Sequence, residues 1–195
     1  MDGATIVKKN LQEAIQLKQQ LLADETTLAH IGIISELVIK CYISGGKILF
    51  CGNGGSAADA QHLAAELSGK YYYDRRPLFA EALHVNTSHL TAVANDYSFE
   101  DVYSRLTEAM GRKGDILIGL STSGNSRNVI KAMEMAMSKG MSTVGLTGQG
   151  GGGMKPVCDY LIEIPSADTP RIQECHMLVG HTICEIVEHK LFPRR

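Results

Sequence analysis

Short apolar segments alternate along most of this chain with longer segments in which apolar residues recur at helical spacing. The short segments predict five β-strands, over residues 47–51, 80–85, 115–120, 142–146 and 160–164. Helices are predicted over residues 56–68, 87–93, 99–110, 125–138 and 171–190. This alternation predicts an α/β fold in which parallel strands form one sheet with helices on both faces. The glycine run 150–153 predicts a flexible loop between the last two strands.

Two helical patterns precede the first predicted strand, which is more than a minimal α/β unit needs. Their apolar stripes are formed by Val7, Leu11, Ala14 and Leu21, and by Ile31, Ile34, Val38 and Cys41. Gly45-Gly46 marks the expected end of the second helix. We expect this N-terminal helical pair, residues 1–45, to cover another surface, either of the same domain or of a second subunit.

The composition is that of a soluble globular protein. The 195 residues are 44% hydrophobic and 21% charged, which allows a sizeable core. Lys and Arg total 19 against 21 Asp and Glu, so the formal net charge is −2. Nucleic-acid surfaces normally show a basic excess, and we therefore expect no nucleic-acid partner. No segment predicts a signal peptide or approaches the ~20 apolar residues of a membrane span, which predicts a cytoplasmic protein with no membrane partner.

The cysteines indicate reduced thiols. Their number is odd and no C-x-x-C pair occurs, so the pattern does not predict a disulfide framework. They are interpreted as small buried hydrophobic residues, namely Cys41, Cys51, Cys158, Cys175 and Cys184.

Polar turns follow three of the predicted strands or their connections. They are Gly52 to Ser56, Asn95-Asp96, and Ser121 to Ser126. Ligands of an open parallel sheet bind beyond the carboxyl ends of its strands, so these turns are the candidate site.

The third turn, S-T-S-G-N-S, carries four hydroxyl groups at a strand-to-helix junction. Free backbone N–H groups at a helix start favour an anion, and Gly124 permits a close approach. No Gly-Lys-Ser/Thr sequence follows, so a nucleotide P-loop is excluded and a small monophosphate is the expected ligand. An ordinary N-cap cluster remains an alternative, because Ser and Asn are preferred caps.

The glycine turn after the first strand does not match a dinucleotide fingerprint. Gly52-x-Gly54 is present, but Ala57 stands where the third glycine is required. Asn86 follows the next strand where an acidic residue would bind the ribose. We therefore expect no nucleotide cofactor, and a glycine turn at which the backbone approaches a sugar.

Two pairs of polar residues have helical spacing. His62 and Glu66 are four residues apart, and Gln173 and His181 are eight apart, so each pair shares a helix face. A carboxylate and an imidazole suit acid/base chemistry near neutral pH, and these residue types also bind metals. From spacing alone, two solvated helix faces are the favoured interpretation. No role is assigned to the remaining histidines, His30, His84, His89, His176 and His189.

Taken in order, these motifs resemble those of the phosphoheptose isomerases in the sugar-isomerase (SIS) domain family. The resemblance rests on C-G-N-G-G-S from Cys51, H-x-A-A-E-L from His62, Asn95-Asp96, S-T-S-G-N-S from Ser121 and R-I-Q-E-x-H from Arg171. It implies a single SIS domain over residues 1–195, with a three-layer, five-stranded parallel sheet of flavodoxin-like order and extra N-terminal helices. It also implies a cytoplasmic homotetramer with active sites at subunit contacts.

The resemblance implies conversion of sedoheptulose 7-phosphate to D-glycero-D-manno-heptose 7-phosphate through an enediol(ate), the first step of nucleotide-activated heptose biosynthesis. It implies that Glu66 and His181 are the catalytic acid/base pair. The implied zinc site, one ion per subunit at partial occupancy, is formed by His62, Glu66, Gln173 and His181. The implied substrate contacts are Asn53, Gly54, Gly55, Ser56, Glu66, Asn95, Asp96, Ser121, Thr122, Ser123, Ser126 and Gln173.

Two alternatives stand beside this hypothesis. A non-catalytic SIS-domain relative binds the bacterial replication initiator, but it lacks counterparts of Glu66 and His181, which are both present here. Isomerases of hexulose or arabinose phosphates are a second alternative, and they differ in the glycine turn and lack an H-x-x-x-E pair.

Overall fold

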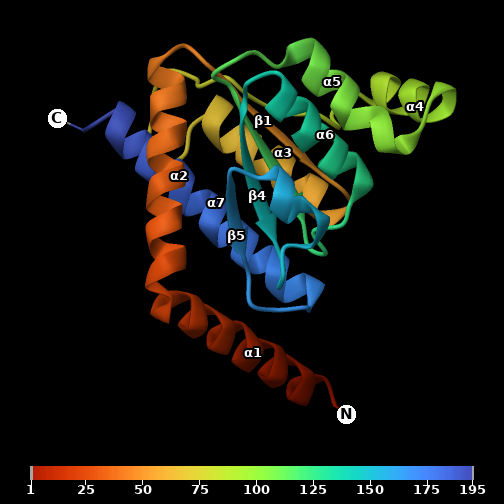
Figure 1. Ribbon diagram of the computed structural model, residues 1–195. Helices are drawn as coiled ribbons and strands as arrows, with labels where there is room; N and C mark the ends of the chain where they lie inside the picture. Colours follow the sequence, from red (N-terminus) through yellow and green to blue (C-terminus); the bar gives the residue numbers. More distant parts are fainter. Residues whose placement is uncertain (1, 195) are drawn as a thin grey trace.

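The computed structural model describes residues 2–194 and contains one parallel sheet flanked by helices (Figure 1). Its strands are β1 (Ile48–Gly52), β2 (Ala80–Ala82), β3 (Ile116–Ser121), β4 (Ser142–Thr147) and β5 (Tyr160–Glu163). Its α-helices are α1 (Gly3–Ala23), α2 (Glu25–Ile43), α3 (Gly55–Ser68), α4 (Thr87–Asp96), α5 (Val102–Met110), α6 (Arg127–Ser138) and α7 (Thr169–Leu191). Two 3₁₀ helices, η1 (Phe99–Asp101) and η2 (Gly152–Val157), complete the described chain.

The strand order is β2-β1-β3-β4-β5, and all pairings are parallel. This is the flavodoxin-like order, so the predicted fold class is confirmed. The central strands β1 and β3 are buried along their whole length. Continuous burial of this kind is expected when helices cover both faces of a parallel sheet.

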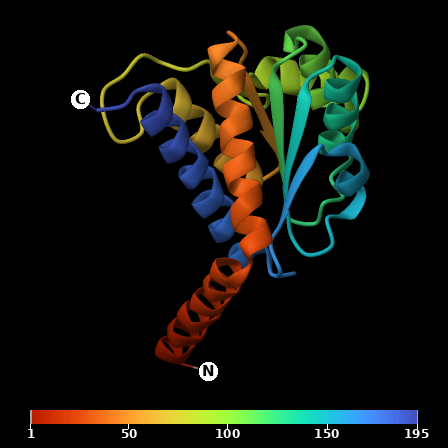
Figure 2. The same ribbon diagram turned by 60° about the vertical axis from the view of Figure 1, so that its left-hand side comes forward.

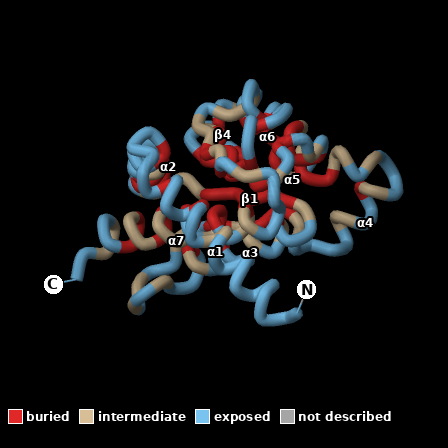
Figure 3. Tube along the Cα trace, turned by 90° about the horizontal axis from the view of Figure 1, so that it is seen from below, coloured by how far each residue is buried: buried red, intermediate tan, exposed pale blue. Residues whose placement is uncertain are grey.

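Successive residues of β1 serve the two faces of the sheet, because side chains alternate along a strand. Ile48 and Phe50 join the core under α2, α3 and α7, whereas Leu49 and Cys51 join the core under α5, α6 and η2. Figure 2 shows these two helical layers on opposite sides of the strands, and Figure 3 shows the buried residues between them. The molecule is therefore a three-layer sandwich.

Helix α1 extends away from this body (Figures 1 and 2). Only Leu17 and Leu21 of this helix are buried, whereas Val7, Leu11 and Ile15 are more than half exposed. The two N-terminal helices therefore have different roles. Helix α2 covers the sheet, and α1 presents an apolar stripe outward.

Helix α2 is long and apolar enough, by length and composition, to cross a membrane. The expectation that no stretch approaches a span was therefore wrong for Glu25–Ile43. However, α2 packs against α7 and β5, and Ile34 and Val38 are completely buried in the core. Core helices of soluble proteins meet the same criterion, so this helix is weak evidence for a membrane.

The second predicted strand and the predicted glycine loop differ from the structure. The second strand, expected over residues 80–85, ends at Ala82, because a turn closed by Val85 N–H donating to Ala82 O follows it. The glycine run 150–153, expected to be a flexible loop, enters η2 at Gly152. Three of its glycines have positive φ, and Gly153 N–H donates to Asn125 Oδ1 at 2.9 Å, so tertiary contacts order the segment.

Candidate active site

The loops that follow β1, β3 and β4 are joined by hydrogen bonds at the carboxyl edge of the sheet. Gly148 N–H, after β4, donates to Thr122 O, after β3, at 3.0 Å. Asn53, after β1, exchanges two side-chain hydrogen bonds of 2.8 and 2.9 Å with Asn128 in the first turn of α6. Two of the three predicted polar turns therefore lie together where an open parallel sheet binds ligands.

The hydroxyl groups of the turn Ser121–Ser126 face one another. Ser121 Oγ lies 2.9 Å from Ser126 Oγ and 3.5 Å from Ser123 Oγ. Ser126 is the N-cap residue of α6, yet its side chain makes no capping hydrogen bond. The capping alternative therefore does not account for this hydroxyl, which remains available, with the positive end of α6, to an anion.

Gly124 sets the path of this turn. Its φ is +66°, and a Cβ there would overlap the carbonyl oxygen of Gly151. The adjacent Asn125 Oδ1 accepts from Gly153 N–H, so a hydrogen bond joins the hydroxyl turn to the glycine run. This close approach explains why a glycine stands among the hydroxyl residues.

The glycine turn after β1 is held by the side chain of Tyr103 on α5. Tyr103 O–H donates to Gly52 O at 2.5 Å and lies 3.4 Å from Asn53 Oδ1. Gly54, with φ +56°, precedes α3, and Ser56 is buried in its first turn. Asn53 and the exposed Gly54 are thus presented at the sheet edge, whereas the Ser56 side chain faces inward.

Helices α3 and α7 bring His62, Glu66 and His181 together. The Nε2 atoms of His62 and His181 are 3.0 Å apart, and His62 Nε2 is 3.0 Å from Glu66 Oε1. Gly180 permits the helices to approach at this level, since a Cβ there would meet the Leu63 side chain at 2.5 Å. Three residues that the sequence placed on two separate helix faces therefore form one cluster.

Gln173 lies two turns before His181 on the same helix. Its carboxamide packs against Gly55, where a Cβ would clash with it. The structure thus places Gln173 at the start of α3, beside the glycine turn, and places His181 farther along α3, beside His62. Gln173 is aligned with the cluster along α7, but within residues 2–194 no hydrogen bond joins its amide to His62, Glu66 or His181.

Asn95 and Asp96 lie elsewhere in this chain. They are exposed at the end of α4, where Asn95 Nδ2 donates to Asp96 Oδ1 at 2.8 Å. Within the described residues, no hydrogen bond or ion pair joins them to the two turns or to the histidine cluster. They lie in the connection after β2, as predicted, and close the helix of that connection.

Comparison with known proteins identifies the family. The SIS domain model matches residues 11–148. A phosphoheptose isomerase of Aneurinibacillus thermoaerophilus is 50% identical over 95% of this chain and 94% of its own length. The solved phosphoheptose isomerase from Neisseria gonorrhoeae is 42% identical, with a TM-score of 0.88 over 95% of this chain and 98% of that one. The one from Francisella tularensis is 32% identical, with a TM-score of 0.91 over 97% and 100% of the two chains.

This chain belongs to the phosphoheptose isomerase family of SIS-domain proteins. The relationship extends over nearly its whole length, and the fold of the solved family members matches the one described above. The family resemblance inferred from the motifs is therefore confirmed.

The histidine cluster fits a divalent metal ion. One ligand atom from each of His62, Glu66 and His181 lies within 4.8 Å of the others. Nitrogen and oxygen donors without thiolate suit zinc, and also nickel or manganese. Side-chain exposure is 50% at His62 and 23% at Glu66, so the cluster is open on one side to an incoming ligand.

Sequence reasoning did not identify several residues beside these motifs. Asn128 belongs to the first turn of α6, and its polarity next to the hydroxyl turn was an available signal. Tyr103 gave no such signal, because its partner Gly52 lies about 50 residues earlier. Tyr71, whose ring centroid is 5.7 Å from that of His181, was also missed. Burial raises the pKa of the Tyr71 phenol, so it stays protonated beside the cluster.

The thiols are not reactive groups. All five cysteines are free, and four are buried. Burial raises the pKa of Cys41 to about 11 and those of Cys158 and Cys184 to about 12. Because the thiolate is the reactive form, the interpretation of these residues as small hydrophobic groups is supported.

Proposed function

We propose that this protein converts sedoheptulose 7-phosphate to D-glycero-D-manno-heptose 7-phosphate through an enediol(ate). The observation that carries the proposal is the meeting of Glu66 from α3 with His181 from α7, both within 3.0 Å of His62. A carboxylate and an imidazole that share one cluster supply a base for a carbon-bound proton and an acid for a carbonyl oxygen. The phosphoheptose isomerase activity for which the relatives are named agrees with this chemistry.

In the proposed reaction, Glu66 removes a proton from C1 of the open-chain ketose. His181 donates a proton to the C2 carbonyl oxygen, which gives the enediol(ate). His181 then accepts the proton of the C1 hydroxyl while Glu66 returns its proton to C2, so that C1 becomes the aldehyde carbon. Both residues end in their starting protonation states, and no redox cofactor is needed.

The phosphate is assigned to the hydroxyl turn and the sugar to the residues around the glycine turn. Ser121, Thr122, Ser123 and Ser126 would bind the phosphate, supported by the uncapped start of α6. The sugar contacts are assigned to Asn53, Gly54, Gly55, Ser56, Glu66, Asn95, Asp96 and Gln173. Since Asn95 and Asp96 lie apart in one chain, their assignment requires a site completed by another subunit.

We assign the metal as zinc, one ion per subunit at partial occupancy, held by His62, Glu66, Gln173 and His181. Bound there, zinc would polarise the substrate carbonyl. A carboxamide is a weaker ligand than a thiolate, which is why partial occupancy is expected. Because these ligands bind metal in their deprotonated forms, metal binding should weaken as the pH falls.

The metal assignment is tested by elemental analysis of the wild type, His62→Ala and His181→Ala, with His189→Ala as a control. His189 is an exposed histidine at the end of α7. The wild type and the control should hold metal, and the two cluster variants should not. Equal metal in all four proteins would show that the cluster does not hold it.

The activity is tested by incubating the purified protein with sedoheptulose 7-phosphate and following aldose phosphate formation by NMR. Glu66→Gln is the matched control, since it removes the carboxylate and preserves the side-chain volume. Failure of the wild type to form an aldose would refute the proposed reaction. A binding role at the bacterial replication initiator is not favoured, because Glu66 and His181 are present and adjacent to His62.

The remaining assignments concern the whole protein. We propose that residues 1–195 act as one domain in a homotetramer, although Met1 and Arg195 lie outside the described residues. The stripe on α1 supplies a surface for subunit contacts. We also propose a cytoplasmic location and, from the product's chemistry, a role in nucleotide-activated heptose biosynthesis for surface polysaccharide such as lipopolysaccharide.

A further inference from the structure

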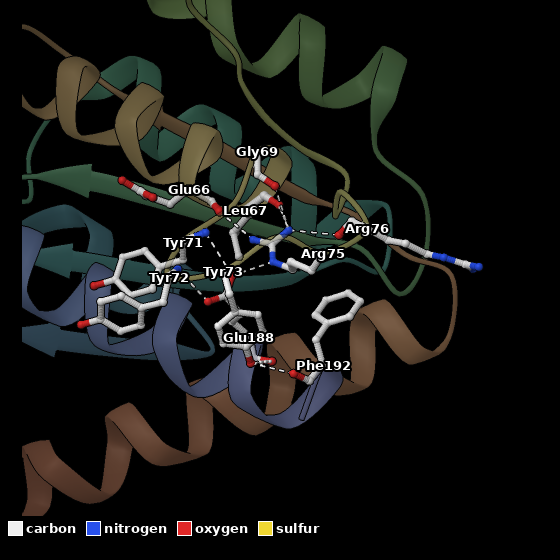
Figure 4. Close-up of polar contacts among 10 residues, drawn as sticks. All are labelled: Glu66, Leu67, Gly69, Tyr71, Tyr72, Tyr73, Arg75, Arg76, Glu188 and Phe192. Carbon is white, nitrogen blue, oxygen red and sulfur yellow. Dashed lines mark hydrogen bonds and ion pairs between the residues drawn. The ribbon is translucent and has the colours of Figure 1, made fainter. Parts of the chain in front are cut away.

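The last turn of α3, which carries Glu66, is capped by an arginine from the segment that follows the helix. Arg75 Nη2 donates to Glu66 O at 2.7 Å, and Nη1 donates to Leu67 O at 2.8 Å and Gly69 O at 3.1 Å (Figure 4). The last carbonyl groups of a helix lack partners within it. Since α3 has no basic residue in its last turn, Arg75 supplies the missing donors and a positive charge.

The same guanidinium is paired with Glu188 on α7. Arg75 Nε donates to Glu188 Oε1 at 2.9 Å, and their side chains are 2% and 1% exposed. Glu188 also accepts from Tyr71 N–H at 3.0 Å and Tyr72 N–H at 2.8 Å. Burial acts to raise the pKa of Glu188, but these backbone donors and Arg75 outweigh it, so the pKa is lowered and the carboxylate stays charged.

This ion pair connects α3 and α7, the helices that carry Glu66 and His181. Glu188 lies seven residues beyond His181 on α7, about 10 Å along the axis and on nearly the same face. Tyr71, held by its backbone to Glu188, places its ring 5.7 Å from that of His181. The Arg75–Glu188 pair therefore contacts the turn that carries Glu66, the helix that carries His181, and the tyrosine beside it.

We propose that Arg75 and Glu188 are positioning residues, which hold Glu66 and His181 at the separation that proton transfer requires. The proposal rests on the catalytic roles assigned above. Neither residue is proposed to contact the substrate, because Arg75 acts on α3 through backbone carbonyl groups and Glu188 is buried beneath the segment 71–75. Displacement of a catalytic group by about 1 Å costs on the order of 100-fold in rate.

A purely structural role is the competing explanation, and the molecule offers a matched control for it. Lys47 and Asp115 form a second buried ion pair, with side chains 12% and 4% exposed. Asp115 accepts from Lys47 Nζ, Lys47 N–H and Arg112 N–H, so it satisfies three donors, as Glu188 does. This pair precedes β1 and β3, at the amino edge of the sheet, and within residues 2–194 no hydrogen bond or ion pair joins it to His62, Glu66 or His181.

The experiment compares Arg75→Lys and Glu188→Gln with Asp115→Asn. All three variants should melt at lower temperature, because each weakens a buried ion pair. Arg75→Lys and Glu188→Gln should lower kcat by about 10- to 100-fold. KM should stay within about threefold, since the hydroxyl turn assigned to the phosphate lies between β3 and α6 and contacts neither residue of the pair. Asp115→Asn should keep kcat within about threefold at a temperature where it remains folded. Equal kcat losses in all three variants would overturn the proposal.

A second measurement separates positioning from loss of active protein. Glu188→Gln should reduce the residual rate of Glu66→Gln by less than about threefold, because the Glu66–His181 separation that the pair holds no longer governs the rate once the Glu66 carboxylate is absent. An unchanged fold-loss in that background would mean that Glu188→Gln only reduces the active fraction, and the proposal would fail. Near-normal turnover by Glu66→Gln alone would be a different result. It would refute the catalytic assignment of Glu66, and the positioning proposal would fail for that reason.

Discussion

At the scale of single residues, Glu66 and His181 come from helices more than a hundred positions apart in the sequence, yet both contact or adjoin His62. We expect Glu66→Gln and His181→Gln each to lower turnover by at least about 100-fold, the usual contribution of a positioned acid or base. KM should change little, because the phosphate residues lie on another loop. The NMR assay measures this, and a variant with near-normal turnover would remove its residue from the mechanism.

His176 gives the folded state a dependence on pH. It is completely buried in α7, its Nε2 lies 3.2 Å from Thr147 O, and burial lowers its pKa from 6.5 to about 4. Between these two pKa values, His176 is protonated in the unfolded chain and neutral in the folded protein. The contribution of neutral His176 is fully present above the unfolded pKa and is lost as the pH falls toward the folded one.

We expect this histidine to account for about 2 kcal/mol of the unfolding free energy lost between about pH 7 and about pH 5. His176→Gln removes the titrating group and retains an amide donor for Thr147 O. Urea denaturation of both proteins at the two pH values measures the difference. Identical pH dependence in wild type and variant would contradict the prediction.

The sequence could predict residues within motifs, but it could not predict the residues that hold those motifs in place. His62 and Glu66 are joined by helical spacing, and Ser121 to Ser126 are adjacent in the chain, so local patterns identify them. The partners Asn53 and Asn128, or Arg75 and Glu188, are 75 and 113 positions apart. No periodicity relates such positions, and only the packing of elements determines their contacts.

At the scale of elements, the hydroxyl turn and the glycine run form one unit. Gly124 has φ +66°, and a Cβ there would overlap Gly151 O, so alanine would separate the two segments. We expect Gly124→Ala to raise KM about tenfold or more, because one hydrogen bond to a charged group contributes about 1.5–3 kcal/mol.

Gly114→Ala is the control for this prediction. Gly114 also has positive φ, +90°, but no atom lies within 4 Å of the position that a Cβ would take there. It should lose stability, about 1 kcal/mol or more for the strained backbone, without a change in KM. The test measures KM by steady-state kinetics and stability by thermal melting for both variants. A normal KM for Gly124→Ala would show that the turn tolerates the separation.

Element order could be predicted because apolar periodicity and turn residues are local properties. The alternation of strands and helices was enough for the α/β fold, while strand order entered through the family resemblance. The sequence pattern gave a wrong prediction where tertiary contacts determine the structure. Strand β2 stops at Ala82, and the glycine run enters η2 because Asn125 and Gly124 accept hydrogen bonds from its N–H groups or from that of the next residue. Asn95 and Asp96 extend the helix predicted over residues 87–93, because α4 continues to Asp96.

At the scale of the whole molecule, α1 presents an apolar stripe that the body of the domain does not cover. Val7, Leu11 and Ile15 of α1 are 59%, 60% and 55% exposed, and they recur every four residues on one helix face. A stripe of this kind marks an interaction site. The proposed tetramer supplies a second copy of the chain to cover it, in line with the closed symmetry of most homo-oligomers.

We expect light scattering to give a mass of four times the 21.1 kDa chain for the wild type. Leu11→Glu preserves helix propensity but places a carboxylate in the stripe, and an unpaired buried charge costs several kcal/mol. This variant should dissociate and lose activity together, because the proposed site needs a second subunit. Gln12→Glu adds the same charge about 100° around the helix and should remain tetrameric. A wild type that is monomeric and fully active would refute both the assembly and the shared site.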